Sequence, residues 1–226
     1  MLRPARNNPV NLWRVKIGKF KLLLMSLLLA AHAAAAGDTH LDFEVFLDAK
    51  PVGTHQFDIQ NLADGTQTIR SVAVFDVKIL GLFAYRYHHQ ASETWKQGCL
   101  ARMDASTDDN GRKIQVSGGL HGDSFQLDQP KSLVREGCII SYAYWDPAIL
   151  LRQRELLNPG TGQFDAVQID SLGEQTIVSR GADVKADHYR LRNGNRAIDL
   201  WYSQAGEWLQ LDSTTPLNRT LHYRRK

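Results

Sequence analysis

Apolar and polar residues alternate along most of the chain, which is the pattern of strands with one buried face. An early example places four apolar side chains on one side of an extended segment: Leu41, Phe43, Val45 and Leu47. Similar runs follow at short intervals, and Asp109-Asn110-Gly111 is the strongest hairpin signal between two of them. We therefore expect a mainly β chain, an antiparallel meander of about ten to twelve strands that forms an open or a closed barrel.

One segment has the signals of a helix instead. Asp146 can cap the free amide groups of a first turn, and Pro147 suits the first helical position. Pro159-Gly160 then ends the segment. These signals predict one short α-helix near residues 146–158.

The strand predicted over Leu80 to Trp95 has the most unusual composition. Alternation puts one aromatic set of side chains on a single face, and that set is Tyr85, Tyr87, His89, Ala91, Glu93 and Trp95. The opposite face, with Arg86, His88, Gln90, Ser92 and Thr94, is polar. If the aromatic face points inward, it takes a carboxylate and an imidazole into an apolar interior, which predicts a ligand pocket.

The residues expected to line this pocket are Tyr85, Tyr87, His89, Glu93, Trp95, Tyr144 and Trp145. Desolvation would raise the pKa of Glu93, so that it could act as an acid or base or hold a polar group of a ligand. Alternatively, Glu93 pairs with Arg102 or a tyrosine and braces the wall of the sheet. Tyr144 and Trp145 could likewise form the rim of a cavity or plug the end of a barrel.

A metal site is not expected. His88-His89 invites one, with His121, Asp123 or His188 as further ligands, but adjacent strand residues point to opposite faces and the usual zinc spacing is missing. The chain also contains no nucleophile elbow, zinc-protease helix, phosphate loop or dinucleotide fingerprint. We therefore expect no cofactor.

Residues 1–36 have the features of a cleavable signal peptide. A basic, acid-free segment precedes the apolar run from Leu22 to Ala31, which is too short to span a bilayer that needs about 20 helical residues. Ala34 and Ala36 fit a cleavage site before Gly37. We expect export to the periplasm, a single β-rich domain over residues 37–226 and no transmembrane segment in the mature chain.

Cleavage changes the charge of the protein. The full chain has 27 Lys and Arg and 24 Asp and Glu, a net charge of +3. Residues 1–36 hold six of the basic residues and none of the acidic ones, which leaves 21 against 24, a net charge of −3. A slightly acidic domain without a dense basic run is not expected to bind nucleic acid or an anionic membrane surface.

Cys99 and Cys138 are the two cysteines of the chain. In an oxidising compartment they could form a disulfide, provided that their strands lie side by side. They could equally remain two separate buried thiols.

Several motifs in their order carry a family resemblance: Phe43-Glu44-Val45, Pro51-Val52-Gly53-Thr54-His55, the Tyr85-to-Trp95 pattern, Asn110-Gly111, Tyr144-Trp145, Leu156-Leu157-Asn158 and Asp199-Leu200-Trp201-Tyr202. The chain resembles an exported Gram-negative family known as a domain of unknown function, number 6134, over nearly all of its mature length. The resemblance implies export, a β-rich architecture and one domain. It brings no established activity.

Three functions are consistent with these patterns. The leading hypothesis is a periplasmic barrel-like protein that binds a lipid or another apolar small molecule. A second is a hydrolase or isomerase that uses Glu93 with His89, His55 or His188. A third is an envelope assembly factor with an apolar surface patch. The sequence gives no oligomeric state.

Overall fold

The computed structural model describes residues 37–79, 82–128, 133–215 and 218–226. The predicted signal peptide and the Leu80-Gly81 pair therefore lie outside the described residues. The first half contains β1 (Thr39–Leu47), β2 (Lys50–Asn61), β3 (Thr66–Ile79), β4 (Leu82–Lys96), β5 (Cys99–Asp109), β6 (Arg112–His121), β7 (Ser124–Leu127) and β8 (Leu133–Glu136). The second half contains α1 (Pro147–Leu150), β9 (Glu155–Leu157), β10 (Phe164–Ala166), β11 (Gln168–Ser179), β12 (Ala182–Asn193), β13 (Arg196–Ser203), β14 (Trp208–Thr214) and β15 (Thr220–Arg225).

Thirteen strands form one antiparallel sheet in the order β11-β12-β13-β14-β15-β1-β2-β3-β4-β5-β6-β7-β8. The mainly β meander predicted from the sequence is confirmed. The sheet is open, because β11 and β8 each pair on one side alone in the described ranges. Long-range pairing of β15 with β1 joins the two meanders into a single sheet.

The helix is much shorter than predicted. It spans four residues, Pro147–Leu150, with the Asp146 carboxylate accepting a hydrogen bond from the Ile149 amide as the capping signal indicated. Glu155–Leu157 is a strand instead, paired with β10. Leu156 and Leu157 are both fully buried there, so burial against the sheet overrides the local helical preference. With β9 and β10 included, the described strands number fifteen, more than the predicted ten to twelve.

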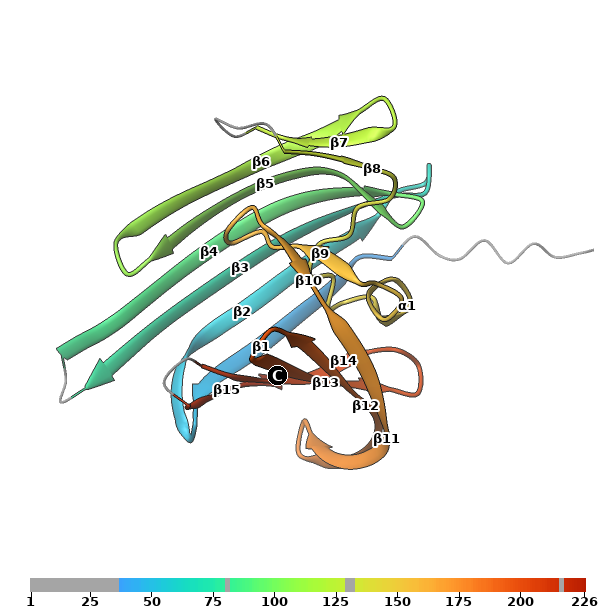
Figure 1. Cartoon of the computed structure of the whole chain (residues 1–226). Helices are drawn as coiled ribbons and strands as arrows, with labels where there is room; N and C mark the ends of the chain where they lie inside the picture. The colour runs from blue at the N-terminus through green and yellow to red at the C-terminus, as the bar shows by residue number, and fades with distance from the viewer. Residues whose placement is uncertain (1–36, 80–81, 129–132, 216–217) are drawn as a thin grey trace, which may run out of the picture. The chain divides into compact units, whose positions relative to one another are not determined.

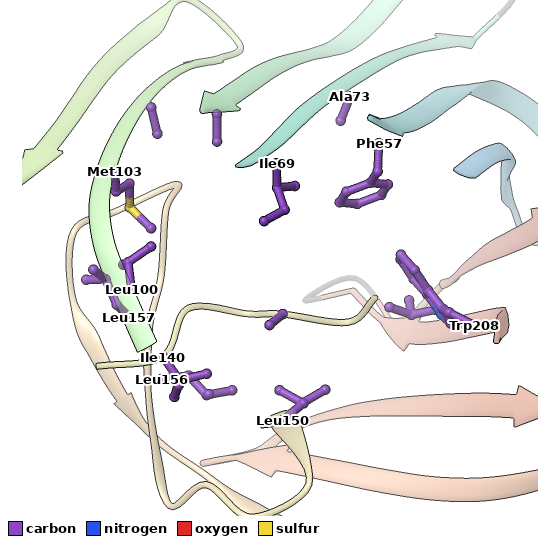
Figure 2. Close-up of a cluster of buried hydrophobic side chains, with 14 of the residues drawn as sticks. Phe57, Ile69, Ala73, Leu100, Met103, Ile140, Leu150, Leu156, Leu157 and Trp208 are labelled. Atoms are coloured by element: carbon purple, nitrogen blue, oxygen red, sulfur yellow. The ribbon is translucent and has the colours of Figure 1, made fainter. Parts of the chain in front are cut away.

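Residues 138–167, called here the inserted segment, connect β8 to β11 and carry α1, β9 and β10. Figure 1 shows this segment in front of the sheet, between the β4–β8 part and the β11–β14 part. Figure 2 shows its side chain Leu157 beside Leu100 of β5, with Leu156 and Met103 in the same cluster. These four side chains are completely inaccessible to solvent, so the inserted segment and the inner face of the sheet share one apolar core.

The hairpin signal of the sequence is confirmed, and a second hairpin has a glycine in its turn. Asn110 and Gly111 join β5 to β6 with φ angles of 52° and 93°, the left-handed values that a two-residue hairpin turn needs. Gly194 lies in the turn between β12 and β13. None of the helices in the described residues is long and apolar enough to cross a membrane.

Candidate functional site

Strand β4 presents the predicted aromatic face to the interior. His89, Ala91, Glu93 and Trp95 are buried, whereas Arg86, His88, Gln90 and Ser92 are exposed on the opposite face. Exposure changes along the inner face, from 37% for Tyr85 to 6% for Glu93 and 2% for Trp95. The predicted site residues therefore divide into a covered group and an accessible group.

Glu93 belongs to the covered group. Its Oε2 atom accepts hydrogen bonds from Trp95 Nε1 at 2.8 Å and from Ser141 Oγ at 3.0 Å. Burial raises the pKa of Glu93 to about 7, although both hydrogen bonds act to lower it. Arg102 does not meet this carboxylate, because it pairs with Asp104. Ser141 lies in the inserted segment, so Glu93 connects that segment to the sheet.

The Glu93→Gln variant tests this carboxylate through the pH dependence of stability. Folding raises the pKa from 4.5 to about 7, so the native state retains a proton that the unfolded chain releases. The stabilisation from Glu93 is complete below pH 4.5 and is lost as the pH rises to 7. At about 1.4 kcal/mol per pH unit, the loss reaches about 3 kcal/mol.

Glutamine can accept the same two hydrogen bonds without titrating. Urea unfolding of both proteins between pH 4 and pH 8 should therefore show the variant gaining stability relative to the native protein as the pH rises. Other titrating groups cancel in the difference between the two proteins. Parallel profiles would mean that Glu93 keeps an ordinary pKa.

Trp145 and Tyr144 hold the inserted segment in place. The Trp145 ring lies edge-on to Trp95, with centroids 5.8 Å apart, and the Tyr144 ring is 5.4 Å from Trp208. The Tyr144 carbonyl accepts a hydrogen bond from the Tyr202 hydroxyl at 2.9 Å. The sequence left two roles open for these residues, the rim of a cavity and a plug. Their contacts with rings of the sheet favour the plug.

A disulfide joins Cys99 to Cys138, which confirms the paired alternative. It links the start of β5 to the start of the inserted segment. Beside it, the Leu100 amide donates a hydrogen bond to the Ile139 carbonyl at 2.8 Å. The covalent link and the backbone hydrogen bond fix where the inserted segment leaves the edge of the sheet.

The accessible group lies toward the β1–β2 hairpin, called here the open end of the inner face. Six apolar and aromatic residues of four strands, called the cradle, are Leu47, Phe75, Val77, Tyr85, Tyr87 and Leu221. Tyr87 stacks on Phe75 with centroids 5.4 Å apart, and the Tyr85 hydroxyl donates to Asp109 at 2.7 Å. Burial raises the pKa of Tyr87 to about 12, so its hydroxyl stays protonated.

A pocket of about 250 Å³ adjoins the cradle. Its apolar lining comes from Leu47, Val52 and Val77, and its charged rim comes from Lys50, Asp76, Lys78 and Arg219. A larger hollow of about 590 Å³ lies elsewhere, over outward-facing polar side chains such as Asp58, Arg70 and Asp104. Leu47 and Val77 of the cradle line the smaller pocket, whereas Glu93 is the residue of the predicted aromatic face that borders the larger hollow.

The histidines are not brought to Glu93. His89 Nδ1 bonds Thr107 Oγ1 at 2.9 Å, and His188 Nε2 bonds Asp199 at 2.8 Å. Burial lowers the pKa of His89 to about 4, so it is neutral at pH 7. The geometry does not provide the Glu–His pair of the hydrolase hypothesis. In the described ranges, no three His, Cys, Asp or Glu side chains are grouped so that they could hold a metal ion.

Phe75, Tyr223 and Leu221 were not predicted as site residues. Phe75 lies in a predicted strand, but its contact with Tyr87 depends on the β3–β4 register. Tyr223 and Leu221 reach the inner face because β15 pairs with β1. Local alternation could have marked each of them as inward-facing, but only the strand order brings them together.

The resemblance seen in the motifs is confirmed by comparison with known families. A family model described as a domain of unknown function (DUF6134) matches residues 43–226. The chain belongs to this family. The DUF6134 fold is similar to the crystal structure of a beta-barrel-like protein of domain of unknown function DUF1849 from Brucella abortus, with a TM-score of 0.61 and 11% identity. That similarity covers 83% of this chain and 94% of the other, and it shows a shared fold. No curated protein matches the DUF6134 chain.

Proposed function

We propose that this DUF6134 protein is exported to the periplasm and there binds a lipid or another apolar small molecule on its cradle. The observation that carries the proposal is the continuation of the apolar inner face beyond the inserted segment. Four of the six cradle residues are partly buried there, Phe75 is buried, and Tyr85 is 37% exposed. Apolar and aromatic surface next to a pocket is the usual composition of a small-molecule site.

The proposed binding site occupies a smaller part of the aromatic face than the sequence predicted, at the end nearest the β1–β2 hairpin. Tyr85 and Tyr87 remain in the proposed site, and His89 lies next to them on the same face. Glu93 and Trp95 take a structural role, because they bond to each other and to the inserted segment. Tyr144 and Trp145 belong with that structural group.

The proposal is tested with an apolar fluorescent probe and two matched arginine variants. Val77→Arg places a charge in the cradle and is expected to weaken binding at least about tenfold, since burying an unpaired charge is costly. Val74→Arg, on the opposite face of the same strand, is the control and should bind like the native protein. Equal affinities for all three proteins, or no binding by the native protein, would contradict the proposal.

Native mass spectrometry of protein purified from the periplasmic fraction supplies the second measurement. We expect a mature chain that begins at Gly37, with an apolar molecule bound. Protein retained in the cytoplasm with residues 1–36 attached would contradict export.

A further inference from the structure

His55 occupies the middle of the inner face. Strand pairing places it in a row with Phe43 on one side and Ala73, His89 and Thr107 on the other. The His55 ring stacks on Phe57, with centroids 4.2 Å apart and planes at 29°. Ala73 is small, so no bulky side chain separates His55 from His89 in this row.

Both ring nitrogens of His55 are buried without a hydrogen-bond partner in the described part of the chain. Part of the residue is accessible, but neither nitrogen is. A neutral imidazole carries one donor and one acceptor, and leaving them unpaired in an apolar interior costs free energy. His89, in the same row, satisfies one nitrogen with Thr107. His55 is therefore a polar group that lacks the partner its neighbour has.

The position of His55 relative to the open end follows from Gly53. Residues two apart in a strand share a face, so Gly53 precedes His55 on the inner face in the direction of the cradle. Gly53 pairs with Val45 and Phe75, and a Cβ atom there would lie 1.8 Å from the Val74 carbonyl oxygen. Only glycine fits beside this backbone, so β2 contributes no side chain to the inner face at this point.

Two aromatic rings of neighbouring strands lie in the row of Gly53. The Phe75 and Tyr223 rings meet edge to face with centroids 6.1 Å apart, and Tyr223 is 5.7 Å from His55. Phe75 belongs to the cradle, so these rings lie between the cradle and His55, and a ligand that reaches His55 must displace them.

The chemistry at His55 selects an uncharged partner. Burial lowers the pKa of His55 to about 3, with a smaller contribution from His89, so the ring is neutral at pH 7. Arg225, at the β15 end of the same row, is separated from His55 by Phe43, and its guanidinium lies over the Phe43 ring, 5.5 Å from the centroid. It donates to the His40 carbonyl at 2.9 Å and lies 3.9 Å from Glu207, while its Nε and Nη1 atoms have no hydrogen-bond partner among the described residues. A neutral imidazole can both give and accept a hydrogen bond, but it cannot neutralise an anion.

We propose that His55 hydrogen-bonds the hydroxyl or carbonyl group of an otherwise apolar ligand, whose remaining atoms lie between Phe75 and Tyr223 and on the cradle. This inference rests on the proposed binding function. It adds the class of ligand: a neutral alcohol or ketone, in preference to an ionised fatty acid.

The test compares decanol with decanoate at pH 8, by displacement of the fluorescent probe. The two molecules share a chain length and differ in the charge of the polar end. The native protein is expected to bind decanol at least about tenfold more tightly, because ionised decanoate would lose its hydration without gaining a cation. In His55→Phe, decanol affinity should fall to that of decanoate, and His55→Gln, which keeps a donor and an acceptor, should retain part of the preference.

His88→Phe is the matched control, because His88 is exposed on the outer face of β4. This variant should bind decanol and decanoate with the same affinities as the native protein. Thermal unfolding checks that each variant is folded. Unchanged decanol affinity in folded His55→Phe, or tighter binding of decanoate by the native protein, would overturn the role of His55. In that case a weakening of binding by Val77→Arg would still support the cradle as the binding site. If the native protein bound neither decanol nor decanoate, the proposed function itself would be overturned.

Discussion

Replacing Cys99 and Cys138 together with serine is expected to lower the free energy of unfolding by about 4 kcal/mol. The two residues are 39 positions apart, and the disulfide between them restricts the unfolded chain across β5–β8. Without it, the unfolded state gains conformational entropy and the inserted segment loses its covalent attachment to β5. Guanidinium unfolding under oxidising conditions measures the difference.

Reduction of the native protein supplies the control for the serine variant. Dithiothreitol should shift the native protein to the stability of the double variant and should leave the double variant unchanged. An unaltered unfolding midpoint in the double variant would show that the disulfide does not stabilise the fold.

Trp208→Ala is expected to cost about 3–5 kcal/mol, the range for deleting a large buried aromatic side chain. Trp208 is 1% exposed, and its ring lies 4.3 Å from Phe43 and 5.4 Å from both Phe57 and Tyr144. It therefore connects β14 with β1, β2 and the inserted segment. Removing it leaves a cavity where β14, β1, β2 and the inserted segment meet.

Trp208→Phe is the matched variant, because it keeps an aromatic ring but loses the indole hydrogen bond to the Gln210 carbonyl. We expect it to cost less than the alanine change in chemical unfolding. If the alanine variant were as stable as the native protein, the contacts of this ring would contribute nothing to the fold.

Much of the sheet could be predicted from local patterns. Alternating side chains indicate strands wherever one face is buried, and Asn110-Gly111 fixes a hairpin because both positions take left-handed angles. The Asp146 cap was predicted for the same local reason. The helix was predicted too long because Leu156 and Leu157 pack against β5 and pair with β10, and both strands lie outside residues 146–158.

The candidate site was less predictable because its contacts join distant residues. Arg102 was considered as a partner for Glu93, but Glu93 pairs in register with Met103, and Arg102 therefore points to the other face. The actual partners of Glu93 are Trp95, on the same strand, and Ser141, which is 48 residues away in the inserted segment. Alternation correctly assigned Glu93 to the interior, whereas its neighbours depend on how the chain returns to the sheet.

The pairing of β15 with β1 also bears on when the protein can fold. β15 follows every other described strand in the chain, yet it lies between β14 and β1, where it joins the two halves of the sheet. While β15 is still being synthesised, the β1–β8 and β11–β14 meanders can each form, but nothing connects them. Completion of the native sheet must therefore wait until translation, and any accompanying translocation, has delivered β15.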